Sequence, residues 1–76
     1  MIIVKMQYFK LGKYIKQRRE QSGWTLNKFA IECDVDSAIL SRIENQKQNI
    51  KINVLEKLAK GFGKSPAEFL TEFEKQ

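Results

Sequence analysis

Apolar side chains recur at intervals of three and four residues along most of the chain, which is the spacing of one face of an α-helix. The first such stretch has Leu11 and Ile15 on one face and ends at Ser22-Gly23. Glycine is common just beyond a helix C-terminus, because it adopts the left-handed backbone at no steric cost. The pattern therefore predicts a first helix over about residues 9–22.

Two shorter helices are predicted next, with only a brief connection between them. Thr25 is a typical N-cap, and the apolar positions that follow it predict a helix over about 26–33. Asp36 is the next N-cap candidate and opens a helix over about 36–45. Two short helices joined so closely must cross steeply, which is the geometry of a helix-turn-helix unit. Asp34 favours this interpretation, because aspartate tolerates the left-handed backbone of a tight turn.

The crossing of these two helices also needs a small residue at the contact and apolar side chains around it. Ala30 has the required size, and the side chains that would fill the wedge are Phe29, Cys33, Val35, Leu40 and Ile43. We expect Cys33 to be a core residue, because a free cysteine behaves as a small apolar side chain.

Two further helices complete a chain of all-α class. Polar residues 46–49 break the pattern, and a fourth helix is then predicted from Ile52 (or Asn53) to Phe62. Residues 65–68 read Ser-Pro-Ala-Glu, the capping-box signature with proline at the first helical position. The apolar positions of the fifth helix that begins there are Phe69, Leu70 and Phe73.

The N-terminal residues do not continue the helical pattern. Ile2, Ile3 and Val4 favour an extended strand, yet no second strand candidate exists in the chain to pair with them. We therefore divide the chain into an N-terminal extension over 1–8, either flexible or a dimer strand, a folded domain over 9–73, and a C-terminal tail over 74–76.

Composition excludes several classes of chemistry. The chain has 76 residues, no histidine and one cysteine, so it is one domain without a Ser-His-Asp or Cys-His site, an internal disulfide or an ordinary zinc site. A domain of this size leaves little volume for a substrate pocket. We expect no enzyme activity, no cofactor, no metal and no small-molecule ligand. No apolar run approaches the ~20 residues of a membrane span, so we expect a cytoplasmic protein.

The charge distribution indicates a polyanionic partner. Net charge is +5, and residues 1–19 carry six basic side chains and no acid. Residues 47–64 carry five lysines against one glutamate. Such a balance favours nucleic acid or an anionic membrane surface as partner, while lysines that only solvate helix surfaces are the alternative.

The motifs along the chain resemble those of one known family. The matching positions are Leu11-Gly12-x-x-Ile15-x-x-x-Arg19, Gly23-Trp24-Thr25, Phe29-Ala30, Val35, Leu40-Ser41-Arg42-Ile43-Glu44-Asn45 and Leu55-x-x-Leu58-Ala59-x-x-Phe62-Gly63. Over about residues 9–73 the chain resembles the Cro/phage-repressor-like (Xre) helix-turn-helix proteins. The spacing Glu44-Asn45-x-x-x-Asn49-x-x-Ile52-x-x-Leu55 is also similar to that of small restriction-modification controller proteins. The resemblance implies a compact five-helix, lambda-repressor-like fold that binds DNA.

Three positions depart from the family pattern. Leu26 stands where the family usually has a glutamine that contacts a DNA phosphate, and only its backbone N–H remains for that contact. Asp34 and Gln46 stand where the family has glycines, at the turn and after the recognition helix. We therefore expect a slightly strained turn and an altered exit from that helix.

The family pattern and helical spacing together assign the site residues. The side chains expected to meet base edges in a major groove are Ser37, Ala38, Ser41 and Arg42. The residues expected at backbone phosphates are Leu26, Asn27, Lys28, Asn45, Lys47, Asn49 and Lys51. The resemblance further implies a partly buried ion pair between Arg19 and Glu44, with two solvated charges as the alternative.

A single small domain covers only a few base pairs, so we expect a homodimer on a two-fold operator in double-stranded DNA. The expected dimer surface is Phe69, Leu70 and Phe73, with Ile2-Ile3-Val4 as the rival. The sequence thus predicts a transcriptional regulator, with repression as the expected outcome. An antitoxin-like or controller protein that mainly binds a partner protein is the alternative. A membrane-surface protein would need a long basic amphipathic helix, and the apolar residues of the 9–22 helix are needed in the core.

Overall fold

The computed structural model describes residues 10–75, and all structural statements below concern these residues. Their helices are α2 (Leu11–Gln21), α3 (Leu26–Cys33), α4 (Ser37–Glu44), α5 (Ile52–Gly61) and α6 (Pro66–Glu74). No strand occurs within residues 10–75, and the predicted all-α class with five helices is confirmed. The expected division at residue 8 concerns residues outside this range and stays a prediction.

Local sequence explains where the helices begin. The hydroxyl of Thr25 accepts a hydrogen bond from the Lys28 backbone N–H at the start of α3. The carboxylate of Asp36 accepts from the Ala38 backbone N–H at 2.8 Å at the start of α4. Each bond satisfies one of the donors that a helix N-terminus leaves without a partner. The predicted caps of both helices are therefore present.

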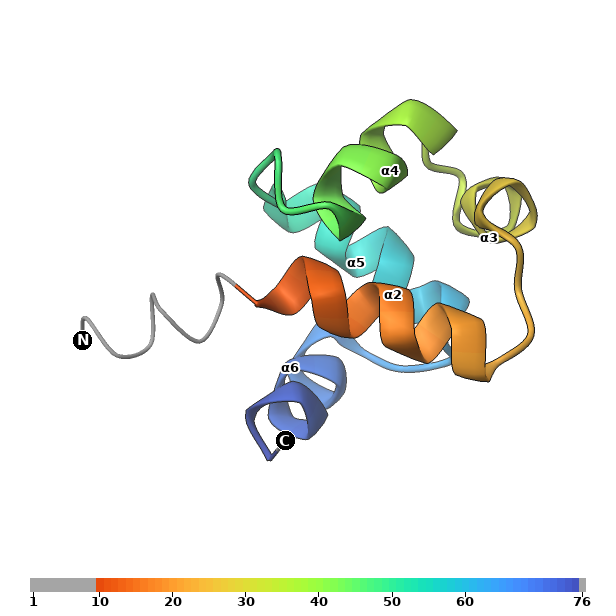
Figure 1. The fold of residues 1–76 in the computed structure, drawn as a ribbon. Helices are drawn as coiled ribbons and strands as arrows, with labels where there is room; N and C mark the ends of the chain where they lie inside the picture. The colour runs from red at the N-terminus through yellow and green to blue at the C-terminus, as the bar shows by residue number, and fades with distance from the viewer. Residues whose placement is uncertain (1–9, 76) are drawn as a thin grey trace.

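One core joins all five helices. Figure 1 shows α4 and α6 on opposite sides of α2, with α3 at one end of the molecule. Each helix contributes a large apolar side chain with 0% exposure, and these are Ile15, Phe29, Leu40, Leu58 and Phe69. Burial of this apolar surface supplies the main favourable free energy of a domain this small.

Helix α6 has the predicted capping box and an unpredicted environment. Ser65 and Glu68 exchange hydrogen bonds of 2.9 and 3.1 Å between side chain and backbone. The expected role of Phe69 and Phe73 at a dimer surface stays a prediction, and the two side chains have 0% and 8% exposure within one chain. The reason is Tyr14 of α2, whose ring centroid lies 5.4 and 5.3 Å from those of the two phenylalanines. Leu70 is partly buried and keeps some exposed surface.

Candidate DNA-binding surface

The turn between α3 and α4 has the geometry that the sequence predicts for a helix-turn-helix unit. Asp34 adopts φ 57° and ψ 47°, the left-handed conformation, immediately after α3. This conformation lets the Val35 N–H reach back to the Ala30 carbonyl at 2.9 Å. Ala30 is 2% exposed at the helix crossing. Aspartate thus fills a position that more commonly holds glycine, at a modest steric cost.

A lysine from another helix also supports this turn. The Lys57 ammonium of α5 donates to the Asp34 carbonyl at 3.2 Å and lies 3.8 Å from the Asp34 carboxylate. These contacts satisfy a carbonyl that the left-handed residue turns away from α3. Sequence spacing gave no indication of them, because the two residues belong to helices whose relative placement only the fold determines.

An ion pair fixes α4 against α2. The Arg19 guanidinium donates from Nε to one Glu44 carboxylate oxygen at 2.7 Å and from Nη2 to the other at 2.9 Å. A third donor, Nη1, reaches the Trp24 carbonyl at 2.8 Å. Arg19 and Glu44 are both buried, at 8% and 6% exposure. The hydrogen bonds to Glu44 raise the pKa of Arg19, so the guanidinium keeps its positive charge.

A glycine allows the backbones of the same two helices to approach closely. A Cβ placed on Gly12 would collide with the Ile43 carbonyl oxygen and carbon. This contact lies near the C-terminal end of α4, and the ion pair holds Glu44 next to it. Helix α4 is therefore held rigidly on its inner side, which leaves its outer side to contact a partner.

The outer face of α4 carries the four side chains that were predicted to read bases. Ala38 and Arg42 are exposed, and Ser37 and Ser41 are half-buried. The inner face holds Leu40 and Ile43 at 0% and 1% exposure. Helix α4 therefore separates a core-facing side from a side that presents one long cationic donor and several small residues.

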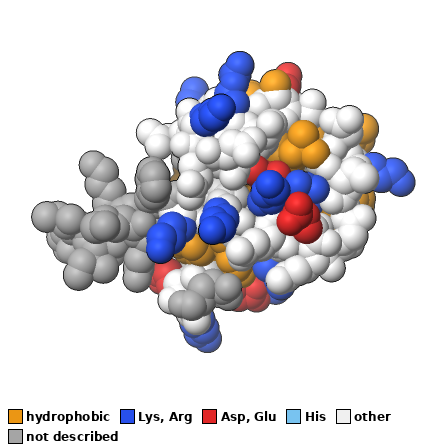
Figure 2. Space-filling model, viewed as in Figure 1, with side chains coloured by type: hydrophobic (Ala, Val, Ile, Leu, Met, Phe, Trp, Pro, Cys, Tyr) orange, Lys and Arg blue, Asp and Glu red, His pale blue; other side chains and the backbone are white. Residues whose placement is uncertain are grey.

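The phosphate-contact candidates lie before and after this face. Asn27 and Lys28 are exposed in the first turn of α3, whereas the Leu26 side chain is half-buried against the core. The loop after α4 exposes the other candidates, which are Asn45, Lys47, Asn49 and Lys51. In Figure 2, lysine and arginine side chains gather at the upper edge of the molecule, over α4 and the loop that follows it. This cationic edge suits a polyanion that lies across α4.

The exit from α4, which the sequence led us to expect in an altered form, has a left-handed residue. Gln46 adopts φ 61°, a left-handed conformation that a side chain of this type rarely adopts. The Lys47 N–H then donates to the Arg42 carbonyl at 2.8 Å. The Asn45 amide donates to the Ser41 carbonyl at 2.9 Å, so the side chain of Asn45 is turned back along α4. The turn thereby brings Lys47 close to the last turn of α4.

Outside this surface, we examined the cysteine thiol, possible metal-binding clusters and the length of the helices. Cys33 is 4% exposed, and burial raises the pKa of its thiol to about 11, so the thiol is neutral and shielded. Residues 10–75 contain no cluster of three carboxylate or thiol side chains that could hold a metal ion. Within the same residues, no helix has the length and apolar character needed to cross a membrane.

Comparison with known proteins assigns the fold and surface to a family. The helix-turn-helix family matches residues 15–69, which include α3, α4 and the turn between them. The chain belongs to this helix-turn-helix family. It is a DNA-binding regulator by family, and the family is one of transcription regulators rather than enzymes.

Two relatives support this assignment. The chain is 34% identical to the control protein C.MunI of a Mycoplasma species over 65 residues, which cover 86% of this chain and 88% of the relative. It is 32% identical to the control protein C.BamHI of Bacillus amyloliquefaciens over 60 residues, or 78% of this chain and 74% of the relative. The resemblance to controller proteins is thereby confirmed. No solved structure gives a significant match.

Proposed function

We propose that this helix-turn-helix regulator binds a specific site in double-stranded DNA by placing α4 in the major groove. The observation that carries the proposal is the contrast between the two sides of α4. Its inner side is held by the buried Arg19–Glu44 pair and by the Gly12 contact, while its outer side exposes Ala38 and Arg42. A helix of this width fits the major groove, where an arginine pairs with guanine through two hydrogen bonds.

Within this proposal, the groups around α4 set the position on the duplex. Lys47 and Lys51, with Asn49 between them, meet phosphates on one side of the groove. Lys28 and the backbone N–H groups at the start of α3 meet phosphates on the other side, where the positive end of the helix dipole favours an anion. Leu26 contributes only its N–H, so the affinity lacks one side-chain contact that the family usually makes.

The control proteins to which this chain is similar support a regulatory role. A single α4 reads only a few base pairs, so we propose a homodimer on a two-fold operator. A protein bound across promoter DNA blocks access of other proteins to it, and we propose repression as the regulatory outcome.

Selection of bound duplexes from a random DNA pool tests this function. The purified chain should enrich a sequence with two related half-sites about 10 base pairs apart from centre to centre. The same selection with Arg42→Ala should lose the preference at one position of each half-site. Enrichment of no sequence, or of the same sequence by wild type and Arg42→Ala, would contradict reading by α4.

A further inference from the structure

The first half of α4 carries no long polar side chain. Residues 37–41 read Ser-Ala-Ile-Leu-Ser, so two hydroxyls are the only polar side-chain groups that they can present to a base. Ser37 and Ser41 are half-buried, and the Ser41 hydroxyl accepts a hydrogen bond of 3.4 Å from the Asn45 amide. The long cationic donor of α4, Arg42, comes only after this stretch. The surface that remains on the first half of α4 is therefore mainly apolar.

Ala38 and Ile39 supply this apolar surface. Ala38 is exposed, and Ile39 is half-buried with part of its side chain packed against the core. A β-branched side chain in a helix is nearly restricted to one χ1 rotamer, so the uncovered part of Ile39 is held in a fixed position. Residues three and four apart are neighbours on a helix surface, so Ala38 and Ile39 both lie next to Arg42.

The major groove of DNA offers one apolar substituent to such a surface. It is the C5-methyl group of thymine, whereas the other groups that distinguish the base pairs there are hydrogen-bond donors and acceptors. We propose that Ile39 recognises a thymine through this methyl group, in addition to the base contacts already assigned to α4. The inference rests on the proposed function, since Ile39 meets a base only if α4 lies in the major groove.

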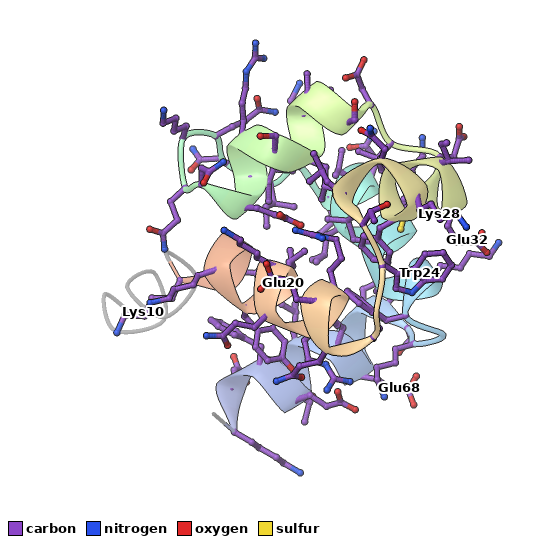
Figure 3. The ribbon with its side chains drawn as sticks, turned by 45° about the vertical axis from the view of Figure 1, so that its right-hand side comes forward. Lys10, Glu20, Trp24, Lys28, Glu32 and Glu68 are labelled. Carbon is purple, nitrogen blue, oxygen red and sulfur yellow. The ribbon has the colours of Figure 1, made fainter. Side chains whose placement is uncertain are left out.

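The surroundings of α4 leave this surface accessible. In Figure 3 the side chains on the upper side of α4 point away from α2, and the labelled carboxylates Glu20, Glu32 and Glu68 belong to other helices. The nearest acid along the chain is Asp36, whose carboxylate accepts from the Ala38 N–H at 2.8 Å. This bond fixes the Asp36 carboxylate at the start of α4.

Helix geometry also predicts where the thymine lies. Ile39 and Arg42 are three residues apart, which is about 4.5 Å along the axis of α4. Successive base pairs are about 3.4 Å apart, so the two side chains meet base pairs separated by one or two steps. The thymine should therefore lie within about two base pairs of the position at which Arg42→Ala loses its preference.

Removal of the methyl group from DNA tests the proposal with the wild-type chain. Deoxyuridine pairs as thymine does and lacks only the C5-methyl group, and it replaces each thymine of the selected duplex in turn. At one position, the affinity should fall about fourfold for each substituted half-site, which is the effect of one buried methyl group. No loss at any thymine, or a loss only at positions farther from the Arg42-dependent pair, would overturn the proposal.

The variant Ile39→Ala connects the methyl group to this side chain. It should bind the thymine and deoxyuridine duplexes equally, whereas wild type and Ile31→Ala should prefer thymine. Ile31 is the matched control, because it is 80% exposed on α3 and has no predicted base contact. The two duplexes are compared within each variant, so a change in the amount of folded protein affects both equally. A full thymine preference in Ile39→Ala would assign the contact to another residue and would overturn the proposal.

The same methyl group also occurs in 5-methylcytosine. Selection from an unmethylated synthetic pool makes thymine the only source of the methyl group, and the cytosines of the selected duplex are then methylated one at a time. An affinity that rises with 5-methylcytosine and does not fall with deoxyuridine would place the methyl group on cytosine and overturn the assignment to thymine.

These experiments separate the inference from the proposed function. If wild type selects no sequence, the proposed function fails and the role of Ile39 fails with it. If wild type selects a sequence that depends on Arg42, but no thymine in it responds to deoxyuridine, then α4 reads bases and only the role of Ile39 is wrong.

Discussion

The Arg19 guanidinium and the Glu44 carboxylate face each other through two hydrogen bonds of 2.7 and 2.9 Å, in the interior between α2 and α4. Two parallel bonds of this kind fix the relative orientation of two planar groups as well as their distance. The same guanidinium holds the Trp24 carbonyl, which follows the end of α2. One side chain thus positions α4 and the segment leading into α3 together.

Arg19→Ala should lower the free energy of unfolding by about 2 kcal/mol or more, because Glu44 is left buried without its partner. Lys64→Ala is the matched control, since Lys64 and Glu72 form a pair of 2.6 Å that is partly exposed. Its loss should cost about 0–1 kcal/mol. Urea denaturation of both variants measures the difference, and an unchanged midpoint for Arg19→Ala would show that the pair does not stabilise the fold.

Gly12→Ala should also destabilise the domain, by about 2 kcal/mol, through a different mechanism. The added methyl group meets the Ile43 backbone, which cannot move without shifting the end of α4. Gly23→Ala is the comparison, because its Cβ meets nothing within 4 Å and its cost comes only from φ 79°. Thermal unfolding followed by circular dichroism distinguishes the two. Only Gly12→Ala should also weaken DNA binding beyond its effect on stability.

Acid should weaken the start of α6 through Glu68. Hydrogen bonds from the Ser65 backbone, and with the Ser65 side chain, lower the pKa of Glu68 below its ordinary value of 4.5. The folded state therefore binds the proton less tightly than the unfolded state, and the stability contributed by this carboxylate is present above pH 4.5 and lost as pH falls through the lowered pKa. The difference in unfolding free energy between wild type and Glu68→Gln should shrink over that range.

Denaturation midpoints measured at a series of pH values check this sign. Glu32→Gln on α3 controls for the loss of one negative charge from the chain. A difference between wild type and Glu68→Gln that stayed constant from neutral to strongly acidic pH would show that the capping box does not depend on the charged form of Glu68.

Local signals predicted the fold well, because helix starts and turns depend on residues close together in the chain. Thr25, Asp36 and Ser65 cap their helices as expected, and Asp34 takes the left-handed turn. The apolar stripe of each helix also predicts the core, since burial follows the helical period. Family resemblance, rather than spacing, supplied the Arg19–Glu44 pair.

The environment of α6 was not predictable in the same way. Its apolar residues indicate a buried face, but the sequence does not show whether the same chain or a second copy covers it. In the structure, Tyr14 of the same chain covers this face. The apolar pattern of α2 did not indicate Tyr14, because its hydroxyl makes tyrosine a weaker sign of a core position than an aliphatic residue. The Lys57 contact to the turn was missed for a related reason, because exposed lysines have no preferred partner that spacing reveals.

Arg42 and Lys47 should make different contributions to DNA binding, the first to sequence discrimination and the second to phosphate contact. Arg42 is exposed on the outer face of α4, so Arg42→Ala should cost about 1–3 kcal/mol on the selected site and relax discrimination at one base pair. Lys47 is exposed in the loop after α4, so Lys47→Ala should weaken binding to selected and random duplexes alike. Its salt dependence, the slope of log affinity against log salt, should fall by about one unit.

Titrations of both duplexes at several salt concentrations measure these two effects, with Lys75→Ala as the control that removes one positive charge elsewhere. Lys75 follows α6, on the side of α2 opposite α4, so its loss should leave the salt slope nearly unchanged. If Arg42→Ala weakened both duplexes equally, α4 would contribute charge without reading sequence. If Lys75→Ala lowered the slope as much as Lys47→Ala, the cationic edge would act through net charge alone, and no phosphate contact at Lys47 would be needed.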